Sequence, residues 1–136
     1  MARVLVVEDD LAIRQMLTMA LELEGYVVDA LGDGAQVVPM LRAATERVVV
    51  LLDLMMPRVT GWEVCERLSA EAALAARHAV VVMSAALTPD MRLPEVVRAG
   101  LVKPFNLATA LALVAALSVE PATTLASPSG EVAAHS

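Results

Sequence analysis

Carboxylate, hydroxyl and ammonium side chains stand at the ends of four short apolar runs in this sequence. They are Glu8 and Asp9 after the first run, Asp53 after the second, Ser84 after the third and Lys103 after the fourth. Carboxylates held together repel one another unless a cation neutralises them, and Mg²⁺ binds carboxylates together with water and phosphate oxygens. An Asp carboxylate can take up a phosphoryl group as an acyl phosphate. The residue types therefore predict Mg²⁺-assisted phosphoryl transfer to Asp53, with Ser84 and Lys103 contacting the phosphoryl oxygens.

These side chains can meet only if the four runs are neighbouring parallel strands. Apolar runs without alternation are typical of strands buried on both faces by helices. Strands that alternate with helices predict an α/β fold with a doubly wound parallel sheet, whose sites lie at the carboxyl ends of the strands. The expected strands are Arg3–Val7, Val27-Val28, Val48–Leu52, Val80–Met83 and a fifth within Val97–Val102. The expected helices are Leu11–Glu24, one ending near Thr45, one from Gly61 with an Ala-rich continuation to Arg77, and Leu107–Leu117.

Local signals predict where several helices begin and end. Gly25 is well placed to stop the first helix. The segment Asp33-Gly34-Ala35-Gln36 resembles a capping box, although Pro39 then requires a kink or a late start. Glu8-Asp9-Asp10 has an alternative interpretation as a set of helix N-caps, and for Asp10 alone capping is the preferred one.

The composition narrows the class of protein. The 136 residues suit one domain, and no uncharged stretch reaches the roughly 20 apolar residues of a membrane-spanning helix. Glu8 interrupts the first apolar run too early for a signal peptide. A net charge of −6 argues against a nucleic-acid partner. The single cysteine, Cys65, excludes an internal disulfide and a Cys-based zinc site and favours the cytoplasm.

Four segments occur in order at the strand ends: Val6-Val7-Glu8-Asp9, Asp53-Leu54-Met55-Met56-Pro57 with Gly61, Met83-Ser84-Ala85 and Lys103-Pro104-Phe105. With this set the chain resembles a response-regulator receiver domain, the phospho-accepting half of two-component signalling, over roughly Arg3–Leu117. The resemblance implies a flavodoxin-like fold with strand order 2-1-3-4-5. We therefore expect a receiver domain at residues 1–118, and the composition of residues 119–136 predicts a disordered tail.

The resemblance also implies a role for each site residue. Asp53 would accept the phosphoryl group from a sensor histidine kinase or a phosphotransfer protein. Asp9, Asp53 and the Met55 carbonyl would bind Mg²⁺, with Glu8 acting through a water molecule. Ser84 would be the switch hydroxyl and Lys103 the lysine of the site, joined to Pro104 by a cis peptide bond. Such a protein is not an enzyme beyond its own phosphorylation and dephosphorylation.

The sequence departs from the family in the segment that follows Ser84. Receiver domains commonly carry an aromatic residue three positions before the lysine, where this chain has Gly100. The segment from Ser84 to Lys103 is also about three residues short, and it contains Pro89 and Pro94. We therefore expect a shortened or irregular fourth helix and an output that lacks the usual hydroxyl–aromatic relay.

Several alternatives concern the output. The last helix is apolar on every side, which predicts a downstream protein partner or a homodimer through this helix and the edge of strand five. The chain is expected to be either a stand-alone receiver or a fragment of a larger regulator. A degenerate receiver that serves only as an interaction module is the main alternative. A haloacid-dehalogenase-like phosphatase is disfavoured because it needs a second Asp where Met55 stands.

The chain contains two histidines, which could in principle bind a metal. We expect His78 to lie at the surface before strand four and His135 to lie in the tail, and neither has a plausible set of companion ligands.

Overall fold

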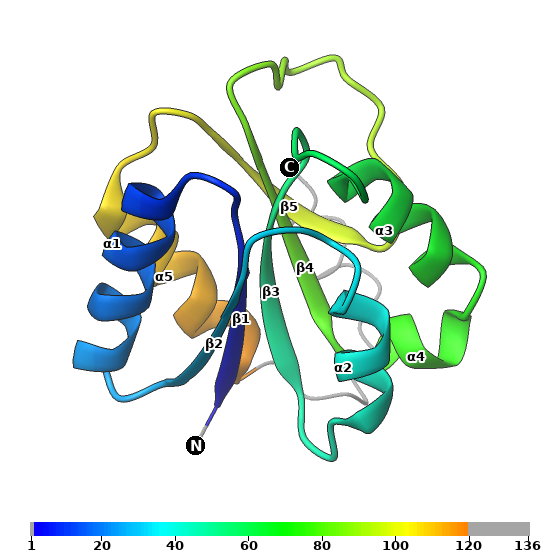
Figure 1. Cartoon of the computed structure of the whole chain (residues 1–136), viewed down its shortest axis with the longest axis horizontal. Helices are drawn as coiled ribbons and strands as arrows, with labels where there is room; N and C mark the ends of the chain where they lie inside the picture. Colours follow the sequence, from blue (N-terminus) through cyan, green and yellow to red (C-terminus); the bar gives the residue numbers. More distant parts are fainter. Residues whose placement is uncertain (1, 120–136) are drawn as a thin grey trace.

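A five-stranded parallel sheet in the order β2-β1-β3-β4-β5 forms the centre of the computed structural model, which describes residues 2–119 (Figure 1). The strands are β1 (Arg3–Val7), β2 (Val27–Leu31), β3 (Val48–Asp53), β4 (Ala79–Ser84) and β5 (Val97–Val102). The helices are α1 (Leu11–Leu23), α2 (Val37–Ala43), α3 (Gly61–Ser69), α4 (Ala72–Arg77) and α5 (Leu107–Ser118). The predicted fold class and strand order are confirmed.

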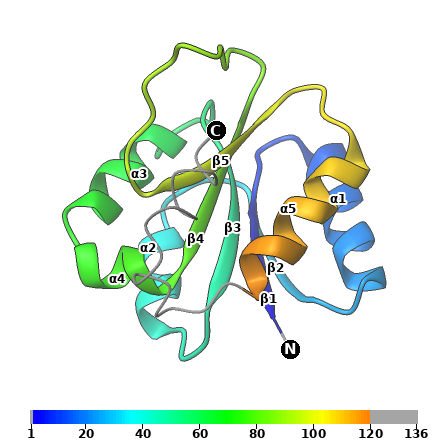
Figure 2. The same ribbon diagram turned by 180° about the vertical axis from the view of Figure 1, so that it is seen from behind.

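The helices cover the sheet in two layers. Helices α1 and α5 lie on one face, and α2, α3 and α4 lie on the other (Figures 1 and 2). Every residue of β3 and β4 is buried, as expected for strands covered on both faces. Within α5, Ala110, Val114 and Leu117 are buried against the sheet, so one side of this apolar helix faces the core. No helix within residues 2–119 is long and apolar enough to cross a membrane.

The ends of the first two helices differ in how well the sequence predicts them. Gly25 follows the cap of α1 with a φ of 97°, so the predicted stop is confirmed. The prediction of a capping box at Asp33 is wrong, because α2 begins only at Val37 and its N-cap residue Gln36 makes no side-chain cap bond. Asp33 instead accepts the N–H of Ala35, two residues on, at 2.8 Å. Pro39 then stands in the first turn of α2, where the missing N–H costs nothing.

The region between β3 and β4 holds two short helices, and His78 follows the second. The prediction that His78 lies at the surface is wrong, since it is only 4% exposed. Its ring bridges two segments: Nδ1 accepts the N–H of Val48 at 3.0 Å, and Nε2 lies 3.2 Å from the carbonyl oxygen of Leu41. The ring thus ties α2 to the start of β3.

The connection from β4 to β5 contains no helix in the described part of the chain, which goes further than the shortened or irregular helix expected from the sequence. Leu87 and Leu93 from this segment pack against the core on the α2–α3 face. A Cβ added at Gly100 would lie 3.1 Å from Cδ1 of Leu87, so these leucines occupy the space beside Gly100.

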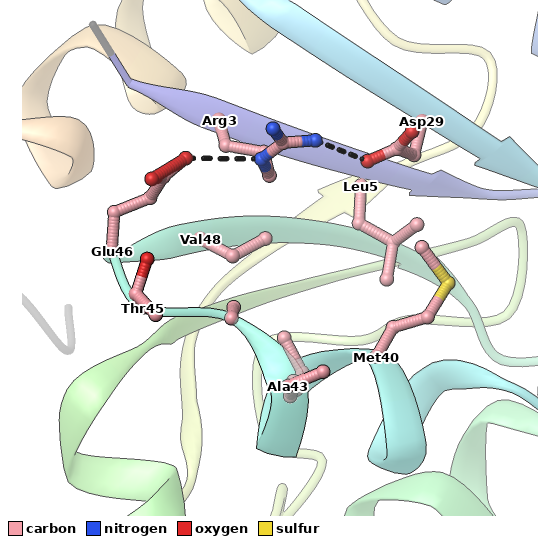
Figure 3. A pocket seen from close by; sticks show the side chains of 10 residues that line it. Arg3, Leu5, Asp29, Met40, Ala43, Thr45, Glu46 and Val48 are labelled. Atoms are coloured by element: carbon pink, nitrogen blue, oxygen red, sulfur yellow. Dashed lines mark hydrogen bonds and ion pairs between the residues drawn. The ribbon is translucent and has the colours of Figure 1, made fainter.

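A hollow of about 300 Å³ lies between the end of α2 and the amino ends of β1 and β3, and its lining includes Arg3, Met40 and Val48 (Figure 3). Arg3 closes its rim through ion pairs with Asp29 at 2.7 Å and with Glu46 at 3.1 Å. Strand β2 extends through Asp29 to Leu31, beyond the predicted Val27-Val28. The predicted tail, apart from Val119, lies outside the described residues, as does His135.

Candidate functional site

The structure brings the predicted site residues together at the carboxyl ends of the strands. Glu8 follows β1, Asp53 and Ser84 are the last residues of β3 and β4, and Lys103 follows β5. They line an open cavity of about 330 Å³. Its other lining residues are Asp9, Asp10, Ile13, Met55, Ala85 and Ala86. One small space thus gathers side chains that lie up to 95 positions apart in the sequence.

Three carboxylates form the acidic part of the site. Oxygen atoms of Glu8, Asp9 and Asp53 lie within 4.8 Å of one another. Glu8 and Asp53 are buried, with 1% and 3% of their surface exposed, whereas Asp9 faces solvent. This set of hard oxygen atoms fits Mg²⁺, and the open cavity leaves room for the water and phosphate oxygens that complete its shell.

The ammonium of Lys103 bridges two of these carboxylates. Its Nζ lies 2.6 Å from Oε1 of Glu8 and 3.3 Å from Oδ2 of Asp53. The Lys103 N–H donates to the carbonyl oxygen of Ser84 at 3.0 Å, which extends the β4–β5 ladder to the site. The Lys103–Pro104 peptide bond is cis, as predicted.

Burial and charge change the acidity of two of these groups. Burial raises the pKa of Glu8 to about 7, against the opposing effects of the Lys103 ammonium and the Asp10 N–H. Burial lowers the pKa of Lys103, but its contacts with Glu8 and Asp53 outweigh burial and leave this pKa above its ordinary value. Lys103 therefore stays a cation beside the acidic cluster at neutral pH.

The packing beneath Asp53 explains why Gly61 is part of the site motif. A Cβ added at Gly61 would overlap the carbonyl oxygen of Asp53 and lie 2.7 Å from Cα of Leu54. Helix α3 begins here with a capping box, in which Thr60 Oγ1 accepts the Glu63 N–H and Glu63 accepts the Thr60 N–H. The start of α3 is thus held directly against the end of β3.

The mouth of the site is formed by the residues that follow β3 and β4. Oδ1 of Asp53 accepts the N–H of Met55 at 3.0 Å, and Oγ of Ser84 accepts the N–H of Ala86 at 3.0 Å. The Met55 side chain is 66% exposed. Neither Met55 nor Ala86 presents a polar side chain to this opening.

Two side chains hold the turn from β1 into α1. The sequence predicted the role of one of them, and it gave no motif for the other. Oδ1 of Asp10 accepts the N–H of Ile13 at 3.1 Å, so Asp10 caps α1 as expected. Arg14, which no motif singled out, donates from Nη1 to the carbonyl oxygen of Glu8 at 2.8 Å. Helical side chains lean toward the N-terminus of their helix, so a long side chain in the first turn of α1 could have been expected to reach back toward β1.

A doubly wound parallel sheet in the order 2-1-3-4-5, with its site at the carboxyl ends of the strands, defines a flavodoxin-like fold. The chain belongs to the response regulator receiver domain family, whose model matches residues 4–115. Receiver domains of this family accept a phosphoryl group and bind Mg²⁺ at an acidic pocket.

Individual proteins show the same relationship. The structure is similar to that of the chemotaxis protein CheY4 of Vibrio cholerae, with 28% identity, a TM-score of 0.74, and coverage of 86% of this chain and 98% of that one. The response regulator TrrA of Thermotoga maritima, solved in complex with Mg²⁺-BeF, is 26% identical with a TM-score of 0.72, and the match covers 86% of this chain and 99% of that one.

Among curated proteins, the response regulator MprA of Mycobacterium ulcerans is 42% identical over 66 residues. The match covers 48% of this chain and only 28% of that protein.

Proposed function

We propose that this chain accepts a phosphoryl group on Asp53 from the phosphohistidine of a sensor histidine kinase or phosphotransfer protein, and that Mg²⁺ assists the transfer. The observation that carries this proposal is the buried Asp53 carboxylate, 3.3 Å from the Lys103 ammonium and beside the carboxylates of Glu8 and Asp9. In the cytoplasm, where such a donor would meet it, the phosphorylated domain signals through altered protein–protein contacts.

In the transfer step a carboxylate oxygen of Asp53 attacks the phosphorus atom. The new P–O bond forms as the P–N bond of the donor breaks, and the electron pair returns to the imidazole nitrogen. Mg²⁺, when bound, neutralises charge on the phosphoryl oxygens. Lys103 supplies a second positive charge, and Ser84, which accepts the Ala86 N–H, keeps its own O–H free to donate to a phosphoryl oxygen. Hydrolysis of the acyl phosphate by water releases inorganic phosphate and returns the Asp53 carboxylate. We expect no enzymatic activity beyond this self-phosphorylation and self-dephosphorylation.

The cation would be held by Asp9, Asp53 and the Met55 carbonyl. Glu8 has a different part because both of its oxygens are already bonded, one to Lys103 and one to the Asp10 N–H at 3.1 Å. We assign Glu8 to a contact through water.

The phosphodonor docks on α1 beside the site. Ala12, Met16, Met19 and Leu23 recur every three or four residues on the solvent side of this helix, and Met19 and Leu23 are 64% and 84% exposed. The stripe leads to a hollow of about 370 Å³ next to Lys103, lined in part by Ile13, Pro104 and Phe105. An apolar helical surface of the donor would cover this stripe and bring its phosphohistidine over the cavity, and flexible Met side chains suit such a contact.

We assign the contact with downstream partners, the output surface, to a groove beside β5 and α5. A groove of about 550 Å³ runs between β5, the 91–95 segment and α5, and Leu113 of α5 lines it. Within residues 2–119, strand β5 lies at the end of the sheet and pairs with β4 alone. A downstream partner or a second copy of the chain would use this groove together with α5.

Phosphorylation by acetyl phosphate with Mg²⁺, followed by intact-protein mass spectrometry, tests the proposal. We expect one phosphoryl group per chain, lost on removal of Mg²⁺ and in Asp53→Asn, and strongly reduced in Asp9→Ala because too few carboxylates then remain to hold the cation. Asp29→Asn, a matched change in β2 at a carboxylate that pairs with Arg3, should be labelled like the wild type.

Labelling of Asp53→Asn to the wild-type level would show that Asp53 is not the acceptor. A wild-type protein that takes up no phosphoryl group would favour the degenerate receiver that acts only as an interaction module.

A further inference from the structure

Arg14 reaches back from α1 to the end of β1. Its Nη1 donates to the carbonyl oxygen of Glu8 at 2.8 Å, six positions earlier in the chain. The guanidinium therefore spans the whole turn that carries Asp9 and Asp10. A charged donor to a backbone carbonyl is a stronger hydrogen bond than a neutral one.

Each of the other polar groups of Glu8 also has a partner. Its N–H donates to the carbonyl oxygen of Leu31 at 3.0 Å, Oε1 contacts Lys103 and Oε2 accepts the N–H of Asp10. Arg14 is thus the side chain that fixes the main chain at Glu8, directly before Asp9. Asp9 itself is exposed, so its position depends on this turn.

Gly32, in the connection that follows β2, makes room for the guanidinium. A Cβ added at Gly32 would lie 3.0 Å from Nη1 of Arg14 and 3.9 Å from its Cζ. Gly32 does not have a positive φ, so its conformation does not itself require glycine. The absence of a side chain at Gly32 is explained by the space that Arg14 occupies.

We propose that Arg14 is a positioning residue for the cation site: it holds the β1–α1 turn so that the carboxylates of Glu8 and Asp9 stay beside Asp53. This inference rests on the proposed Mg²⁺-assisted function. Residues that orient metal ligands without touching the metal typically affect its affinity by about 10–100-fold when they are replaced.

Titration of the protein with Mg²⁺ alone, followed by NMR of the backbone amides of Asp9 and Met55, tests this role without any phosphodonor. Arg14→Met keeps much of the apolar stem but removes the donors, and we expect its Mg²⁺ affinity to fall about tenfold or more. Arg14→Lys keeps one charged donor and should recover part of the affinity. Gly32→Val, which crowds the guanidinium without changing a carboxylate, should weaken Mg²⁺ binding in the same direction.

Arg42→Met is the matched control, because Arg42 pairs with Glu71 at the surface and has no contact with the site. Thermal unfolding without Mg²⁺ separates a positioning role from a structural one. A purely structural role would lower the unfolding temperature of Arg14→Met and leave the Mg²⁺ affinity of its folded state unchanged. If Arg14→Met proves unfolded, Arg14→Lys and Gly32→Val carry the same comparison.

Two negative results have different meanings. If the wild type binds Mg²⁺ and is phosphorylated on Asp53 while the Arg14 and Gly32 variants bind Mg²⁺ equally well, this inference is overturned and the proposed function stands. If the wild type itself binds no Mg²⁺, both are overturned.

Discussion

Gly61 is the residue at which the packing of the site leaves the least freedom. Its Cα faces the carbonyl of Asp53 and the Cα of Leu54, both of which belong to backbone that cannot move aside easily. We expect Gly61→Ala to lower the free energy of unfolding by about 3 kcal/mol, at the upper end of the usual cost of overpacking. Urea denaturation followed by circular dichroism measures this change.

Gly25→Ala provides the comparison. Gly25 has open space around its Cα but a φ of 97°, so this variant carries backbone strain without a clash. It should cost only about 1 kcal/mol. Equal losses in the two variants would contradict the steric explanation for Gly61.

The two apolar residues at the mouth of the site predict a long-lived phosphoaspartate. Met55 and Ala86 line the opening of the cavity, and neither side chain can orient an attacking water by hydrogen bonding. After removal of the phosphodonor, the phosphorylated wild type should decay several-fold more slowly than Met55→Asn. Phosphate release over time is the measurement, and rapid decay unchanged in Met55→Asn would contradict the prediction.

At the level of single residues, the sequence could predict side chains whose place follows from a strand end, such as Asp53 and Lys103. Arg14 and His78 escaped because their partners are backbone groups of other segments. Nothing in the local pattern shows that the ring of His78 meets Val48 N–H and Leu41 O. Such contacts depend on tertiary packing, which residue spacing does not encode.

Among the elements, β1, β3 and β4 were the easiest to predict because each is a nearly unbroken apolar run that ends at or directly before a polar residue. Strand β2 was predicted only in part because Asp29 interrupts its apolar pattern. Helix boundaries were harder. At Asp33 the same residue types suit a capping box and a local turn. The structure has the turn, in which Asp33 accepts the Ala35 N–H and pairs with Arg58 at 2.6 Å. The two prolines after Ser84 pointed to an irregular fourth helix, but not to the role of Leu87 and Leu93 in covering β4 and β5.

Helix α5 and the groove beside it form the surface at which we expect a partner or a second copy of the chain to bind. Leu113 is half-buried in this groove, away from the phosphorylation site. Because α5 contains no charged residue, Leu113→Glu places a charge in the middle of the proposed contact and should weaken self-association or partner binding at least tenfold. Size-exclusion chromatography with light scattering, with and without acetyl phosphate, tests the homodimer.

Met19→Glu on α1 is the matched control for that experiment, since it adds the same charge on a face assigned to the phosphodonor. It should slow phosphorylation by a kinase and leave the oligomeric state unchanged. If Leu113→Glu changes neither oligomeric state nor partner binding, the output surface lies elsewhere.

For the molecule as a whole, His78 makes stability depend on pH. Burial lowers the pKa of His78 below its ordinary value, and the charges of Arg77 and Arg47 add to this, although the bond to Leu41 opposes it. Below about pH 6.5 the unfolded chain therefore takes up a proton that the native ring resists. The stabilising contribution of His78 is present above this pH and is lost as the pH falls toward the pKa of the folded state.

His78→Gln removes the titration. At pH 7.5 we expect this variant to be less stable than the wild type by about 1–3 kcal/mol, because two buried backbone groups lose well-placed partners. The difference should shrink as the pH falls to 5.5. Glu8 titrates in both proteins with the opposite sign, since its raised pKa stabilises the native state as the pH falls from about 7. The difference between urea curves isolates His78, and parallel pH profiles would contradict the prediction.

The position of Lys103 has a consequence for chemical labelling. It is the only lysine of the chain, so amine-directed reagents find one side-chain amine, and that amine lies between Glu8 and Asp53. Acetyl phosphate can acetylate amines as well as phosphorylate carboxylates. Acetylation of the side-chain amine would remove its charge from the site, whereas a bound phosphoryl group would shield it. The rate at which this one amine is acylated is therefore a direct reporter of whether the site is occupied.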